Sequence, residues 1–165
     1  MKGLEVRPAA LPDIDAILAL ERATPTAPHW PSGAYRAILA AEIFSPRRCL
    51  LVAVVRGQPA VLGFAVGVVH PAGDSELESV AVAESLRRRG IGRALCAAVA
   101  EWCRQQGARE LLLEVRASST GAIALYKRLG FDPVGSRPRY YHQPVDDAVV
   151  MRLLLQAEVE HCRAP

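Results

Sequence analysis

One amphipathic helix between two strands constrains the fold of this chain most strongly. Its apolar side chains recur at helical spacing from Gly90 to Gln106, and Gly107 supplies a residue that ends it. The stripe consists of Ile91, Ala94, Leu95, Ala98, Val99, Trp102 and Cys103. The runs Glu76–Val82 and Leu111–Arg116 on either side read as strands. A strand, a helix and a second strand in succession predict one parallel crossover within a sheet.

The remaining periodic runs predict an antiparallel sheet around this crossover. Further strands are expected at Leu4–Arg7, Cys49–Val55, Ala60–Val69, Pro133–Tyr141 and Ala148–Leu155. Further helices are expected at Pro12–Ala23, at Ser32–Ile43, and from a cap at Ser118 or Ser119 through Leu129. The order β-α-α-β-β-β-α-β-α-β-β indicates the α/β (α+β) class, with a mixed, mostly antiparallel sheet.

Composition indicates one globular domain over residues 1–165. The 165 residues are 51% hydrophobic and 22% charged, enough to bury a core without a metal or disulfides. The tail 156–165 is compatible with disorder and gives no functional interpretation. The net charge of +3 indicates arginines on solvated faces, and we expect neither a nucleic acid nor a membrane as partner.

The cysteines and apolar runs bear on location. Cys96 and Cys103 are seven residues apart, which predicts that they fill one buried helix face. The cysteines and histidines lack metal-ligand spacing, so no metal is expected. The longest apolar stretch, Val61–Val69, is too short to span a bilayer, and the first residues lack a signal-peptide run. These features favour a reducing, cytoplasmic location.

A glycine-containing turn at the mouth of the long helix has the chemistry of an anion site. Its sequence is R-R-R-G-I-G-R-A, from Arg87 to Ala94. The two glycines remove Cβ atoms where a ligand approaches, and the first-turn N–H groups have no partners inside the helix. The helix dipole and the arginines favour a pyrophosphate there. The alternative is a tight turn with arginines exposed to water.

Two residues further along are candidates for acid–base chemistry. Glu114 stands within the apolar run L-L-L-E-V-R, which suggests the floor of a cleft, although an ion pair with Arg116 or Arg109 would also explain it. Tyr126 carries a phenol that suits a general acid, although its spacing from Ile123 and Leu129 also fits a core residue.

The turn resembles the R/Q-x-x-G-x-G/A signature of the GCN5-related N-acetyltransferase (GNAT) superfamily. The resemblance implies a sheet of about seven strands with a V-shaped splay between strands 4 and 5, flanked by about four helices. It also implies acetyl-CoA as co-substrate, with its pantetheine amides paired to Val80, Ala81 and Val82. The turn residues implied to hold its pyrophosphate are Arg87, Arg88, Arg89, Gly90, Ile91, Gly92, Arg93 and Ala94.

The stretch L-E-V-R-A-S-x-x-x-A-I-A-L-Y-x-x-L-G-F resembles the RimI-type ribosomal-protein-alanine N-acetyltransferases within this superfamily. The resemblance implies that Glu114 accepts the proton from the amine, through a water, and that Tyr126, twelve residues later, donates a proton to the leaving thiolate. Ser119 stands where the family usually has an asparagine that contacts the cofactor.

The segment R-Y-Y-H-Q-P-V-D-D-A-V-V-M resembles the hairpin of protein N-terminal acetyltransferases. The resemblance implies that Tyr140 and Tyr141 line the acceptor pocket, together with Trp30 in the proline-rich loop Thr24–Pro31. It implies transfer to the N-terminal α-amino group of a protein, such as a ribosomal protein. The tyrosines also fit as strand filler. A small-molecule amine or lysine acceptor, or a non-catalytic CoA-binding module, remain the alternatives.

Overall fold

The computed structural model describes residues 1–25, 27–40 and 46–155, and shows a single seven-stranded sheet in the order β1-β2-β3-β4-β5-β7-β6. All neighbouring strands are antiparallel except β4 and β5, which confirms the predicted mixed sheet with one parallel crossover. The strands are β1 (Leu4–Pro8), β2 (Arg47–Val55), β3 (Gly63–Val69), β4 (Ser75–Val82), β5 (Glu110–Arg116), β6 (Asp132–His142) and β7 (Val145–Leu154). The α-helices are α1 (Ile14–Arg22), α2 (Ser32–Ala40), α3 (Ile91–Gln105) and α4 (Thr120–Arg128).

Most predicted boundaries lie within a few residues of the observed ones. The first helix begins later than predicted, because Leu11–Asp13 form a short 3₁₀ turn in which the Asp13 carboxylate accepts the Ala10 N–H at 2.8 Å. The strand predicted from Ala60 begins at Gly63. The end of the second predicted helix, up to Ile43, falls in 41–45, and the tail is 156–165. Both lie outside the described residues, so the single-domain assignment for 1–165 stays a prediction.

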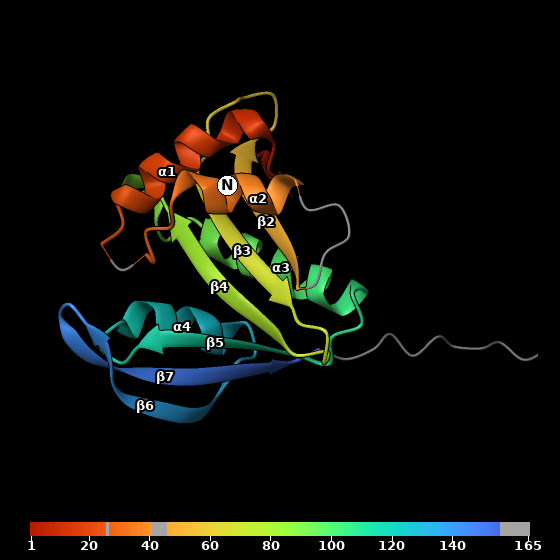
Figure 1. The fold of residues 1–165 in the computed structure, drawn as a ribbon. Helices are drawn as coiled ribbons and strands as arrows, with labels where there is room; N and C mark the ends of the chain where they lie inside the picture. The colour runs from red at the N-terminus through yellow and green to blue at the C-terminus, as the bar shows by residue number, and fades with distance from the viewer. Residues whose placement is uncertain (26, 41–45, 156–165) are drawn as a thin grey trace, which may run out of the picture.

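Helices cover both faces of the sheet (Figure 1). The helices α1 and α2 pack on one face against a cluster that includes Tyr35, Phe64 and Val66. The helix α3 packs on the other face against a larger cluster that includes Leu95 and Val99. Both Cys96 and Cys103 are buried there, as the helix pattern predicts.

The close approach of α3 to the sheet depends on a glycine. A Cβ atom at Gly67 of β3 would lie 2.5 Å from Val99 Cγ1 and 3.2 Å from Cys49 Sγ. Any side chain there would therefore force Val99 of α3 to shift. The N-terminus of α3 follows β4 through a short 3₁₀ turn at Glu84–Leu86.

The sheet splits between its two parallel strands. The strands β4 and β5 are paired only at Glu76 and Leu112, and they diverge from there toward the open side of the V in Figure 1. The edge of β4 beyond Glu76 is thus not paired with β5. This confirms the predicted splay and leaves backbone groups of β4 available to a ligand.

Strand alternation decides which side chains face the splay. In β5, Leu111, Leu113 and Val115 belong to the α3-side core, so Glu114 points from the opposite face. In β4, a bulge relative to β3 between Val66 and Gly67 shifts the alternation, so that Ser79 stands opposite Val66. The helices α1 and α2 pack on the face opposite to α3, so Glu114 points to the same side of the sheet as these two helices.

Candidate active site

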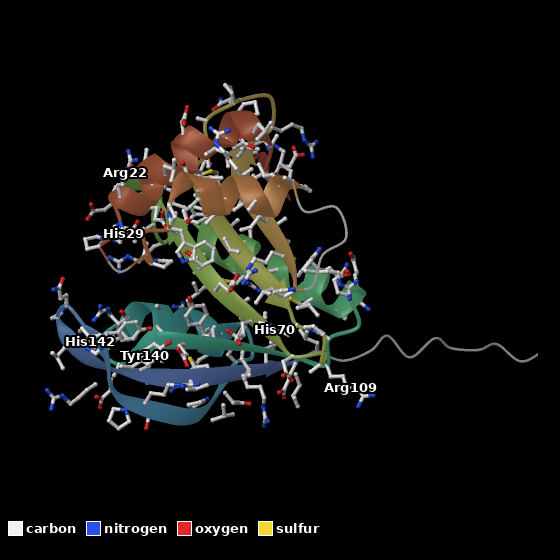
Figure 2. All side chains as sticks on the ribbon, in the orientation of Figure 1. Arg22, His29, His70, Arg109, Tyr140 and His142 are labelled. Carbon is white, nitrogen blue, oxygen red and sulfur yellow. The ribbon has the colours of Figure 1, made fainter. Side chains whose placement is uncertain are left out.

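A cleft of about 680 Å³ lies between β4 and β5 and reaches from α4 to the loop that follows α1. Figure 2 shows His29 of that loop and Tyr140 of the β6–β7 hairpin on opposite sides of the opening. The cleft brings together residues that are far apart in sequence. The predicted site residues that line it are Trp30, Val80, Glu114, Ser119, Tyr126, Tyr140 and Tyr141.

The carboxylate of Glu114 interacts with two side chains of β6. Arg137 forms an ion pair with it, with Nε 2.6 Å from Glu114 Oε1, and the Tyr140 hydroxyl also bonds to the Glu114 carboxylate. The ion-pair partner is therefore Arg137, and neither Arg116 nor Arg109 takes that role. Arg116 instead donates to the carbonyls of residues 143 and 144 and lies 4.2 Å from the Tyr141 ring centroid.

Tyr126 lines the cleft from α4 and is buried against Phe131, with ring centroids 5.7 Å apart. Burial raises the pKa of its hydroxyl, and the neighbouring Cys96 and Tyr141 add to this shift. The raised pKa keeps the phenol protonated at neutral pH. Tyr126 thus belongs to the core and also presents a protonated phenol to the cleft, so a core residue and a general acid are compatible interpretations of this position.

The tyrosine pair forms the wall of the cleft on the hairpin side. The rings of Tyr140 and Tyr141 meet edge to face, with centroids 5.2 Å apart. The hydrogen bond to Glu114, followed by desolvation, raises the pKa of Tyr140. The pairing of β6 with β7 is irregular between Arg137 and Tyr141, where Arg139 has φ of 54° and donates its N–H to Asp147 Oδ1 at 2.7 Å. This irregularity shapes the segment that carries the pair.

The opposite wall depends on a buried carboxylate that sequence reasoning missed. Glu21 of α1 is 1% exposed, and its Oε1 accepts the Trp30 N–H at 3.0 Å and the Tyr35 hydroxyl at 2.7 Å. Trp30 and Tyr35 also pack together, with ring centroids 5.7 Å apart. The loop that places Trp30 in the cleft is therefore tied to α1 and α2. The signal in the sequence was that Glu21 follows Ile14 and Ile17 at helical spacing, on the face of α1 that becomes buried.

The mouth of α3 has the features of an anion site. Its N-cap, Gly90, has φ of 86°, Arg88 has φ of 59°, and the first turn contains no acidic residue. A Cβ at Gly90 would meet nothing within 4 Å, whereas one at Gly92 would lie 3.4 Å from Leu125 Cδ2. Gly90 is thus required by its left-handed backbone rather than by close contacts within the protein.

Only some of the residues expected to bind the cofactor line the cleft. Of the β4 residues expected to pair with pantetheine, Val80 lines the cleft, and Ala81 and Val82 continue the strand toward α3. The Arg87 side chain turns back, with its Nε 3.4 Å from the Val82 carbonyl oxygen. Ser119 occupies the N-cap position of α4, but its hydroxyl does not cap the helix. Ser118 instead bonds to Asp146 Oδ2 at 2.6 Å.

The donor set fits acetyl-CoA. The unpaired edge of β4, the uncapped N–H groups of α3 and the nearby arginines supply donors for the amides and the pyrophosphate. Within the described ranges, no group of His, Cys, Asp or Glu side chains could hold a metal ion, and no helix is long and apolar enough to cross a membrane.

Fold and cleft together define an acyl-transferring enzyme, and the comparisons with known proteins agree. The model of the acetyltransferase (GNAT) family matches residues 14–131, so the chain belongs to this family, whose members use acetyl-CoA as acetyl donor. It is therefore an acetyltransferase with the GNAT fold.

Individual relatives narrow this class. A Bacillus subtilis protein, provisionally named a ribosomal protein bS18-alanine N-acetyltransferase, is 32% identical over 146 residues, covering 88% of this chain and 92% of that protein. The Salmonella typhimurium ribosomal protein bS18-alanine N-acetyltransferase is 40% identical over 82 residues, which cover 48% of this chain and 55% of that protein. The crystal structure of the Escherichia coli ribosomal-protein-S18-alanine N-acetyltransferase superposes with a TM-score of 0.77 at 27% identity. The superposition covers 96% of this chain and 97% of that chain.

Proposed function

We propose that this acetyltransferase transfers the acetyl group of acetyl-CoA to the N-terminal α-amino group of a protein that begins with alanine or another small residue. A ribosomal protein is the acceptor suggested by the names of its relatives. The tyrosine pair and Trp30 on opposite walls of one cleft support a peptide-sized acceptor rather than a free amine.

The observation that carries the proposal is the placement of Glu114 and Tyr126 in the same cleft, Glu114 from the face of β5 opposite to the α3-side core and Tyr126 from that core. Glu114 lies on the acceptor side, toward the tyrosine pair, and Tyr126 lies on α4, whose N-cap residue is Ser119. A proton acceptor and a proton donor therefore face one space from two directions, as transfer from a thioester to an amine requires.

The reaction balances with these two groups. The neutral amine attacks the thioester carbonyl, a C–N bond forms, and the C–S bond breaks. The proton lost by the amine passes to Glu114 through a water, and the departing thiolate accepts a proton from the Tyr126 hydroxyl. Backbone N–H groups on the free edge of β4 stabilise the negative charge that develops on the carbonyl oxygen.

Acetyl-CoA would be held along β4 and at the mouth of α3. Val80, Ala81 and Val82 would pair with the pantetheine amides, and the turn from Arg87 to Ala94 would hold the pyrophosphate. Ser119 would contact the cofactor from α4. The bound thioester supplies an activated acetyl group, and the chain supplies its orientation and the proton transfers.

We also propose a cytoplasmic location. The three described cysteines, Cys49, Cys96 and Cys103, are free and buried, and burial raises the pKa of each thiol, so they are unreactive structural residues. Free thiols of this kind are typical of a reducing compartment.

The experiment is a panel of acceptors with acetyl-CoA. Peptides beginning with Ala, Ser or Met should be acetylated faster than free lysine, polyamines or small amines, as measured by mass spectrometry of the products. Turnover confined to small amines or lysine side chains would replace the proposal with that function. Binding of acetyl-CoA without any turnover would indicate a binding module.

Variants then test the two proton-transfer groups. Glu114→Gln should lower kcat about a hundredfold or more, the scale of general-base catalysis, without changing the affinity for acetyl-CoA. Tyr126→Phe should lower kcat in the same way. Glu110→Gln is the matched control, since Glu110 lies on the same strand at the closed end of the splay. Equal rates for Glu114→Gln and Glu110→Gln would remove Glu114 from the mechanism.

A further inference from the structure

The carboxylate that the proposed function uses as base is already occupied by a cation of the protein itself. We propose that the guanidinium of Arg137 occupies, before the acceptor binds, the place beside Glu114 that the acceptor's amino group and the water linking it to the carboxylate must take. Arg137 thereby sets the apparent affinity of the enzyme for its acceptor. The inference rests on the proposed function in one respect, the assignment of Glu114 as the base.

The exposure of the two partners shows which of them can give way. The Glu114 side chain is 25% exposed and the Arg137 side chain is 61% exposed. Glu114 extends from β5, whose neighbours are β4 and β7, whereas Arg137 extends from β6, the last strand of the sheet. The carboxylate is thus a fixed part of the cleft floor, and the guanidinium reaches it from the solvent side.

The side chains of β7, which lies between β5 and β6, leave room for Arg137 to extend to Glu114. Arg137 stands opposite Ala148 of β7, and Glu114 stands opposite Val150 of the same strand. Since directly paired residues share a face, the arginine side chain crosses β7 over the small Ala148. Gly135, paired with Val150, adds no side chain on that face. The approach of Arg137 to Glu114 therefore follows the surface that borders the acceptor opening.

Arginine and an N-terminal ammonium compete for the same bond. Both are cations whose N–H groups donate to a carboxylate, and Arg137 Nε lies 2.6 Å from Glu114 Oε1. An acceptor amine that is to lose its proton to Glu114, directly or through one water, must come within hydrogen-bond reach of that carboxylate. While the guanidinium lies against Glu114 Oε1, neither the amine nor the water that would relay its proton can take this position.

Displacing Arg137 from Glu114 requires little free energy. Ion pairs with one largely exposed partner contribute little, equivalent to no more than about a fivefold change in an equilibrium. The guanidinium also has a second contact at hand, since Arg137 Cζ lies 5.7 Å from the Tyr140 ring centroid. A cation–π contact of this kind can retain the arginine beside the cleft once Glu114 is released.

The test compares steady-state kinetics of three variants at saturating acetyl-CoA. Arg137→Ala should lower the acceptor KM about two- to fivefold and leave kcat unchanged, because the competing cation is gone. Arg137→Lys should keep the wild-type KM, because a cation remains. Arg152→Ala is the matched control, since Arg152 pairs with another glutamate of β5, Glu110, at 3.7 Å and does not line the cleft, and it should leave the acceptor KM as it is.

An acceptor KM that is unchanged or higher in Arg137→Ala would overturn the inference, as would an equal decrease in Arg152→Ala. A merely structural role for Arg137 would lower the unfolding temperature and kcat without lowering KM. Failure of the proposed function is distinct, because it appears in the wild-type enzyme as a lack of peptide acetylation. The Arg137 comparison would then use whichever amine the enzyme accepts.

Discussion

Replacing Gly90 with alanine tests how the backbone at the mouth of α3 contributes to binding. Gly90 has φ of 86°, and a Cβ there would meet no atom within 4 Å. The substitution therefore introduces no clash within the protein, and its cost is the conformational one for a side chain in the left-handed region, about 1–2 kcal/mol.

This cost is divided between stability and affinity. If the variant keeps the native turn, the strain lowers the free energy of unfolding, and the unfolding temperature falls by about 2–8 °C for a chain of this size. If the turn relaxes instead, acetyl-CoA must restore it, and the affinity falls by up to about 30-fold. The two losses, expressed as free energies, should add up to about 1–2 kcal/mol.

Gly57 provides a matched control. It has φ of 80°, a Cβ added to it would also meet nothing within 4 Å, and it lies in the turn between β2 and β3. Gly57→Ala should show the loss in stability alone. The measurements are thermal unfolding and titration calorimetry with acetyl-CoA. A summed loss near zero for Gly90→Ala, or an equal loss of affinity in both variants, would refute the reasoning.

Two further predictions concern the supports of the site. Tyr35→Phe removes one of the two donors to the buried Glu21 and should lower the free energy of unfolding by about 1.5–3 kcal/mol; it should also raise the acceptor KM, as seen by thermal unfolding and kinetics. Arg7 lowers the pKa of Asp13, so this carboxylate stabilises the fold above its unfolded pKa, and the stability is lost as pH falls through the lower folded pKa. Asp13→Asn should therefore weaken the decrease in the free energy of unfolding at acid pH, as measured by denaturation at a series of pH values. The same pH dependence in the variant and the wild type would contradict this.

The elements that the sequence predicts well are those with a strong local signal. The stripe on α3 and the apolar strand β5 are determined by the spacing of their own side chains, and the crossover follows from their order along the chain. The glycine turn and the spacing of Glu114 and Tyr126 also sit within one continuous segment. These features could be assigned because each depends on residues close together in sequence.

Tertiary structure alone decides the partners of the site residues. The sequence indicated Arg116 or Arg109 as a counter-ion for Glu114, yet Arg137 takes this role because β7 is inserted between β5 and β6 and turns one face of the hairpin toward the cleft. Glu21 likewise supports Trp30 only because α1 packs against the loop that follows it. Hydrogen bonds and ion pairs between distant segments depend on strand order and register, which local periodicity does not encode.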